Sequence, residues 1–97
     1  KPLSIECVVD IARLMLNKTK NMLEAKGIGL DIAEEGIRKL AELGFDPKFG
    51  ARPLRRVLQE KIDDEVANKI LAGELKRRDT VIINAEATID IEKAKSL

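Results

Sequence analysis

Apolar residues recur at intervals of three and four along the first quarter of the chain, the pattern of an amphipathic helix. Ser4 stands where its hydroxyl can accept from the exposed amides of a first turn, and Gly27 is suited to end the helix. The main row is Ile5, Val8, Val9, Ala12, Met15, Leu16, Met22 and Leu23, and a second row is Cys7, Ile11 and Leu14. We therefore predict a long helix over residues 4–26, buried on more than one side.

A second helical pattern follows a short extended piece at 28–30. Asp31 is placed to begin this helix, with Glu34 three residues later as an acidic variant of the capping box. Gly44 then stands at the position just after the helix end, where glycine is favoured. The expected inner face is Ala33, Ile37, Leu40 and Ala41.

A third helix is predicted to start at Pro53, where a fixed φ and a missing N–H are tolerated. Gly73 closes it. Its expected inner stripe is Leu54, Val57, Leu58, Ile62, Val66, Ile70 and Leu71.

The hydrophobic period then changes from about 3.6 to about 2, which indicates strands. "TVIIN" at 80–84 is β-branched, and "TIDIE" at 88–92 alternates, with three residues between them. A hairpin is the expected connection. With the piece near Ile28, the prediction is an α+β fold of three main helices and a roughly three-stranded sheet, in the order helix–strand–helix–helix–hairpin, forming one domain over 1–97.

The composition narrows the function classes. Eighteen basic and 17 acidic residues give a net charge of +1, which argues against a protein that mainly coats nucleic acid or an anionic membrane. The chain has no histidine and one cysteine, so no metal site, and no catalysis by histidine or a cysteine–histidine pair, is expected. Cys7, in its apolar pattern, is expected to be a reduced core residue of a cytosolic protein. The chain begins with Lys1, so we expect a fragment of a longer protein.

The stretch "GFDPKFGARPLRR" at 44–56 separates the second and third helices. One interpretation is an ordinary corner, in which Phe45 and Phe49 fill the gap between helices, Gly50 takes a left-handed φ, and Arg52 is merely solvated. A second interpretation starts from the partial positive charge at the amino end of a helix. Arginines at 52, 55 and 56 are unfavourable there unless an anion lies nearby, and phosphate is the obvious anion.

The residues of this corner carry a family resemblance. "GFDPKFGARPLRRVLQEKI" at 44–62 resembles the sensor-2 segment of AAA+ ATPases, and most closely that of the Clp-family unfoldases. The likeness extends to "IGLDI", "LAELG" and "ILAGELKRRDTVIIN", and so covers nearly the whole chain. The domain that it resembles is the C-terminal small domain of the second ATPase module. Phe45 and Phe49 stand where tyrosine is common, and Glu65 replaces a frequent proline, which suggests a straighter third helix.

The resemblance implies a function. Arg52 would be the sensor-2 arginine, which reaches the β- and γ-phosphates of ATP, with Gly50, Ala51 and Pro53 positioning it. The absent large domain would hold ATP and Mg²⁺, and the small domain would close over them and couple hydrolysis to domain rotation and protein unfolding. The family's partners would be the chain's own large domain, neighbouring subunits of a hexameric ring and, through the parent protein, a Clp peptidase, in the cytoplasm.

The chain itself has no GxxxxGK[ST] phosphate loop and no acidic pair after a hydrophobic strand. We therefore expect the isolated chain not to be an enzyme and its parent to be an ATPase. Two alternatives remain. "KRR" at 76–78, together with the corner arginines, suggests a nucleic-acid module that grips phosphates, although only two aromatics are present. The second alternative is an oligomerisation module without a ligand. The wide apolar stripe of the first helix and the exposed edge of a short sheet are suitable for contact with a neighbouring subunit, although a wide stripe is equally suited to the core.

Overall fold

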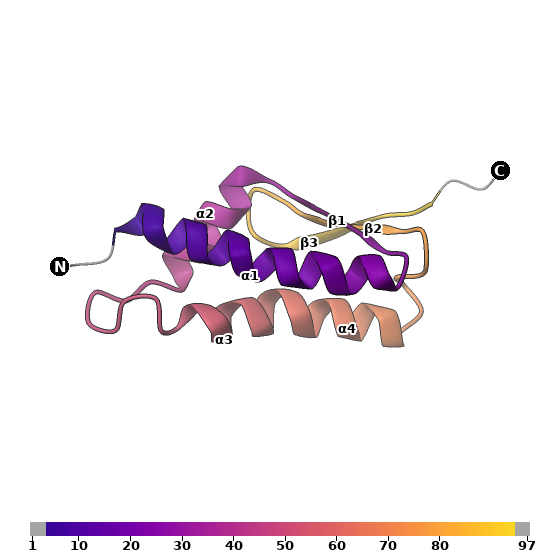
Figure 1. Cartoon of the computed structure of the whole chain (residues 1–97). Helices are drawn as coiled ribbons and strands as arrows, with labels where there is room; N and C mark the ends of the chain where they lie inside the picture. The colour runs from indigo at the N-terminus through magenta and orange to yellow at the C-terminus, as the bar shows by residue number, and fades with distance from the viewer. Residues whose placement is uncertain (1–3, 95–97) are drawn as a thin grey trace.

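The computed structural model describes residues 4–94 and has the predicted α+β fold (Figure 1). The elements are α1 (Ile5–Ala25), β1 (Gly29–Ile32), α2 (Glu34–Leu43), α3 (Leu54–Leu58), the π-helical segment η1 (Gln59–Asp63), α4 (Asp64–Leu71), β2 (Thr80–Ile83) and β3 (Ile89–Glu92). Because α3, η1 and α4 run on without a break, they make up the predicted third helix. The predicted element order is therefore confirmed. No helix within residues 4–94 is long and apolar enough to cross a membrane.

The three strands form one mixed sheet in the order β1-β2-β3. β1 runs parallel to β2, with Leu30 opposite Val81, and β3 is antiparallel to β2, with Ile91 opposite Val81. Because side chains alternate between the two faces of a strand, Leu30, Val81 and Ile83 all turn towards the helices and are buried. The predicted hairpin and the third strand are both confirmed.

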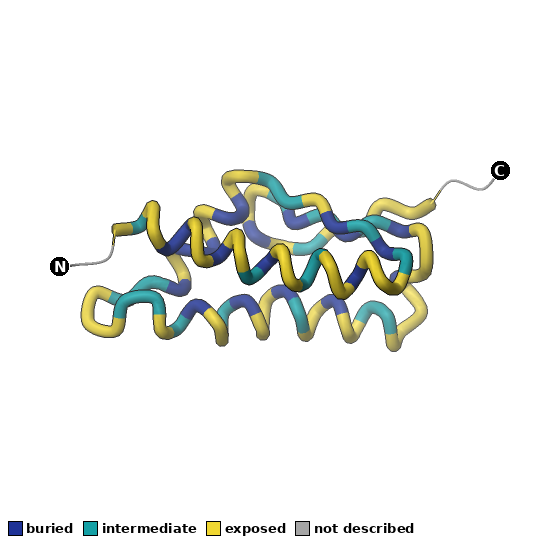
Figure 2. Tube along the Cα trace, viewed as in Figure 1, coloured by how far each residue is buried: buried dark blue, intermediate teal, exposed yellow. Residues whose placement is uncertain are grey.

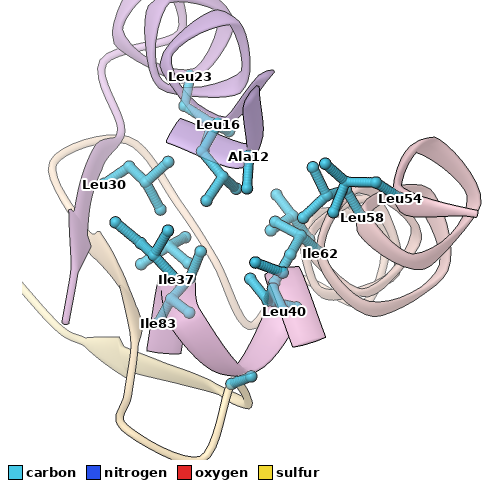
Figure 3. Packing of buried hydrophobic residues seen from close by; sticks show 14 of the residues in the cluster. Ala12, Leu16, Leu23, Leu30, Ile37, Leu40, Leu54, Leu58, Ile62 and Ile83 are labelled. Carbon is cyan, nitrogen blue, oxygen red and sulfur yellow. The ribbon is translucent and has the colours of Figure 1, made fainter. Parts of the chain in front are cut away.

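The core lies between the helices and one face of the sheet (Figure 3). The long α1 runs beside the continuous helix α3–η1–α4 (Figure 1), α2 packs against both α1 and α3, and α1 also packs against β1. Exposed residues follow the outer side of both long helices, and buried ones the inner side (Figure 2). Side chains with less than 2% of their surface exposed come from every layer: Leu16, Leu40, Leu54, Ile62, Ile83, Val8 and Val81.

The first helix keeps its predicted bounds but not its second buried face. Ser4 Oγ accepts from the Cys7 N–H at 3.3 Å, and Gly27 ends the helix with φ +79°. The second apolar row lies outside the core, because Cys7, Ile11 and Leu14 are all exposed. The expectation that Cys7 is a core residue is therefore wrong: one stripe of α1 fills the space between α2, α3 and β1, and its opposite side has no described element to cover it.

The second helix begins at Glu34, and the expected start at Asp31 is wrong. Asp31 pairs with Ile82 as part of β1, and the chain stays extended through Ala33, whose N–H donates to the Ile83 carbonyl at 2.9 Å. Glu34 is no capping residue either. Its two carboxylate oxygens accept from the Arg13 guanidinium at 2.6 and 2.9 Å, which ties α2 to α1 and lowers the Glu34 pKa.

The third helix starts within one residue of Pro53 and contains the π-helical segment η1. Most of its predicted stripe is buried or half-buried. Leu71 is the exception, at 85% exposed. It lies one residue beyond Ile70, and one residue turns an α-helix by about 100°. This step takes Leu71 off the inner face.

Candidate functional site

The corner between α2 and α3 has a hydrogen-bond frame of its own. Asp46 and Gly50 exchange backbone hydrogen bonds, with N···O distances of 2.8 and 2.6 Å. The Asp46 carboxylate also accepts from the backbone N–H of Lys48 at 2.6 Å and of Phe49 at 3.0 Å. Gly50 has φ +65°, the left-handed value that the sequence predicted and that glycine adopts freely. The five-residue turn is thus held from within.

The other end of the corner is fixed to the core through Leu54, which is 1% exposed. Its N–H donates to the Ala51 carbonyl at 3.0 Å, and the Val57 N–H donates to the Pro53 carbonyl at the same distance. Gly44 has φ −93°, so it does not take the left-handed conformation often found after a helix end. It is needed because a β-carbon there would lie 2.6 Å from the Leu54 Cα.

Arg52 lies on the exposed outer side of this corner, between Gly50 and α3. Its N–H donates to the Phe49 carbonyl at 3.3 Å, and its Cζ lies 5.3 Å from the centroid of the Phe49 ring. Among residues 4–94, the Arg52 guanidinium forms no ion pair with a carboxylate. Phe49 is half-exposed, so its expected place in the gap between helices is wrong, whereas Phe45 is half-buried against the core.

The three arginines of the corner have different neighbours. Arg56 Nε lies 3.8 Å from Glu60 Oε2, one turn along the same helix, and both side chains are well exposed. Arg55 lines a groove between α1 and α3 beside Met15. Arg52 is therefore the one arginine of the three that contacts an aromatic ring on the corner itself.

The second basic segment, "KRR" at 76–78, lies at the opposite end of the long axis from the corner (Figure 1). Arg77 packs along the backbone at Gly27, where a β-carbon would lie 2.7 Å from the Arg77 Cγ. The arrangement does not favour the interpretation as a phosphate-gripping nucleic-acid module.

A buried carboxylate near that segment was missed from the sequence. Asp79 is 3% exposed and accepts hydrogen bonds from the Lys93 ammonium at 2.5 Å, the Lys76 N–H at 2.8 Å and the Ala94 N–H at 2.9 Å. These bonds, with Lys93 contributing most, lower the pKa of Asp79 to about 2. The available signal was an aspartate directly before a β-branched strand. Its contacts are structural: they join the turn before β2 to the chain after β3.

Neither the grooves nor the acidic residues add a further candidate centre. A groove of about 370 Å³ runs between α1 and the η1–α4 part of the third helix, with mostly apolar walls that include Met22 and Val66. Thr19 on α1 donates to Asp63 at 3.1 Å across the two helices. Within the described part of the chain, no group of three or more His, Cys, Asp or Glu side chains could hold a metal ion.

The α+β fold, with its three helices and mixed three-stranded sheet, is consistent with the small domain of an AAA+ ATPase. A family model described as the C-terminal, D2-small domain of ClpB protein matches residues 3–83, and the chain belongs to that family. The match runs from α1 through β2.

Relatives in plants and bacteria agree with this assignment. The chain is 40% identical over 86 residues to the mitochondrial chaperone protein ClpB4 of Arabidopsis thaliana, covering 89% of this chain and 9% of that protein. It is 39% identical over 94 residues to the probable chaperone protein ClpB 1 of Chlorobaculum tepidum, covering 97% of this chain and 22% of that protein. It is 44% identical over 77 residues to the chaperone protein ClpB of Rickettsia conorii, covering 79% and 9%. The chain thus spans less than a quarter of the length of these relatives.

Proposed function

We propose that this chain closes over ATP held by the large domain of a Clp-family ATPase, with Arg52 contacting the β- and γ-phosphates. The observation that carries the proposal is the exposure of the Arg52 guanidinium and its lack of a carboxylate partner within residues 4–94. Arg52 also stands on a corner fixed at both ends. A planar guanidinium can bind phosphate oxygens in a bidentate manner.

A difference in how Arg52 binds ATP and its hydrolysis product would couple hydrolysis to domain rotation. A hydrogen bond to a charged group contributes about 1.5–3 kcal/mol, and Arg52 loses partners when the γ-phosphate leaves. A ligand shifts a conformational equilibrium only through different affinities for the two states. Because Arg52 is two residues from the buried Leu54, a change in its position is transmitted to the helical core. Hydrolysis would rotate this domain against the large one.

The same proposal covers the longer protein. Its large domain would hold ATP and Mg²⁺, and hexameric ring assembly would place this domain against a neighbouring subunit to unfold client proteins in the cytoplasm. A Clp peptidase would be a further partner of that ring. The isolated chain would neither hydrolyse nor measurably bind ATP, since Arg52 alone has no phosphate loop beside it. Calorimetric titration showing micromolar affinity for the 97-residue chain would contradict that statement.

A graft experiment tests the role of Arg52. A ClpB chaperone whose own D2-small domain has been deleted receives this chain in its place, with Arg52 intact or changed to alanine. Arg56→Ala is the matched control, because Arg56 is equally charged, exposed and near, but pairs with Glu60. Steady-state ATPase rates are measured for each graft, and ring assembly is measured by sedimentation.

The expected result is that the intact graft and Arg56→Ala restore turnover, whereas Arg52→Ala assembles but turns over at least about tenfold more slowly, the factor given by about 1.4 kcal/mol. Equal turnover of the intact graft and the Arg52→Ala graft would show that the corner is packing only. If the intact graft also fails, the comparison is repeated with the same substitutions in the native parent protein.

A second candidate function is oligomerisation without a nucleotide contact, and the exposed row on α1 favours it. Ile11 and Leu14 are 37% and 68% exposed on the side of α1 that faces away from the core. Changing both to serine in the graft would then reduce ring assembly, while Arg52→Ala would change neither assembly nor turnover. The two candidates therefore predict opposite results for the turnover of the Arg52→Ala graft.

A further inference from the structure

We propose that Phe49 is the positioning residue for Arg52: its ring holds the guanidinium on the outer side of the corner while leaving its charge free for an anion. This inference rests on the proposed phosphate contact of Arg52 and adds how the arginine is held ready for it. Phe49 touches no reacting group and acts through Arg52.

The contacts form a short chain from backbone to guanidinium. Asp46 accepts the Phe49 N–H at 3.0 Å, and the Phe49 carbonyl accepts the Arg52 N–H at 3.3 Å. The Arg52 Cζ then lies 5.3 Å from the ring centroid, inside the distance of about 6 Å at which a cation and an aromatic face attract. Backbone and side chain of Phe49 therefore both contact Arg52.

The charge of Arg52 explains why an aromatic ring suits this position better than a carboxylate. A carboxylate partner would neutralise the guanidinium and compete with phosphate, whereas a ring attracts a cation without neutralising it. The carboxylate of the corner itself, on Asp46, is already occupied by the N–H groups of Lys48 and Phe49. Arg52 is thus restrained and still fully charged, which lowers the entropy that it loses on binding an anion.

The exposure of the ring argues against a packing role. Phe49 is 49% exposed, while Phe45 and Leu54 supply the apolar contacts that fix the corner to the core. Lys48 places its Nζ 5.5 Å from the same ring centroid, so the ring attracts two cations. Lys48→Ala is therefore a matched control, since it removes the other cation and leaves Phe49 and Arg52 in place.

The first test measures the contact in the 97-residue chain by NMR. The Arg52 side-chain protons are expected to be shifted upfield by the ring current, and Phe49→Leu should abolish the shift. Phe49→Tyr and Lys48→Ala should retain it. Backbone amide signals of the core report that each variant is folded. Identical Arg52 shifts in the unchanged chain and in Phe49→Leu would overturn the proposal.

The second test is a double-mutant cycle in the graft, read as kcat/KM for ATP. Phe49→Leu should lower kcat/KM about two- to fivefold, the factor that an exposed cation–π contact corresponds to, and Phe49→Tyr should restore it. In the Arg52→Ala background Phe49→Leu should have no effect, because the two changes remove one interaction. An equal loss in both backgrounds would mean that Phe49 acts structurally and would overturn the proposal.

The outcomes distinguish the proposed phosphate contact of Arg52 from the positioning role of Phe49. If Arg52→Ala leaves turnover unchanged, the proposed function itself fails. If Arg52→Ala lowers turnover and Phe49→Leu does not, the proposed function stands and the positioning role of Phe49 fails.

Discussion

The backbone of Gly44 lies against Leu54 so closely that a β-carbon on residue 44 would be 2.6 Å from both the Cα and the Cδ1 of Leu54. This approach joins the end of α2 to the start of α3, the two sides of the corner that carries Arg52. Leu54 is buried and Gly44 meets it with backbone atoms, so neither residue can move aside without disturbing the surrounding structure. The contact fixes the base of the corner, and the Asp46–Gly50 hydrogen bonds fix its tip.

Gly44→Ala should destabilise the chain by about 1–3 kcal/mol, the usual cost of overpacking, and should shift the amide signals of Phe49 and Arg52. Gly73→Ala is the control: it places alanine at φ +78° but with no atom within 4 Å of the new carbon. It should cost about 1–2 kcal/mol through backbone strain alone and leave the corner signals unchanged. Urea unfolding and NMR measure both effects, and an undisturbed corner in Gly44→Ala would contradict the close contact.

The corner shows what sequence could predict and what it could not. The left-handed Gly50 and the start of α3 near Pro53 follow from local chemistry, so they were predictable. The reason for Gly44 depends on Leu54, ten residues away, and a local pattern offered only the helix-end explanation. The start of α2 was misplaced for the same reason: Asp31 has a capping pattern, but its pairing with Ile82 across the sheet prevails.

The burial of side chains at the edge of an apolar stripe also could not be predicted from the spacing. Spacing alone predicted that Leu71 is buried like Leu54 and that Cys7 is buried like Val8. In the structure Leu71 and Cys7 are exposed, whereas Leu54 and Val8 are buried. Which side of a helix is covered depends on its neighbours in space. Likewise, the sequence identified Arg52 as the candidate, but the distance from its guanidinium to Phe49 required the structure.

Leu54→Ala should cost about 2–5 kcal/mol of unfolding free energy, because it opens a cavity in a filled core. Leu71→Ala should change stability by less than about 0.5 kcal/mol, as an exposed substitution does. The chemical change is the same in both variants, so the difference reports burial. Denaturant unfolding measures both, and equal losses would place Leu71 in the core after all.

Cys7 should react with a thiol reagent in the native chain, because its side chain is exposed on α1. The reaction rate in buffer should be similar to that in denaturant, measured by the absorbance of the released thiolate. Cys7→Ser should leave the melting temperature nearly unchanged. Protection of the thiol until the chain unfolds would show that this side of α1 is covered in solution, as it would be in a self-assembled state.

Asp79 should make stability depend on pH in the acid range. Its pKa is about 2 in the folded chain against an ordinary 3.8, so the folded state binds a proton more weakly than the unfolded state. The stabilisation that Asp79 contributes is therefore complete above its ordinary pKa and is lost as the pH falls from 3.8 towards about 2. Asp79→Asn should unfold at lower urea concentration than the unchanged chain at neutral pH, and the gap should narrow as the pH falls through this window. In a chain that carries Lys93→Ala, the same gap in unfolding urea concentration should narrow less as the pH falls. It should still narrow, since the two backbone N–H donors to the Asp79 carboxylate remain. A gap that stays constant with pH would show that the carboxylate contributes through its shape and not through its charge.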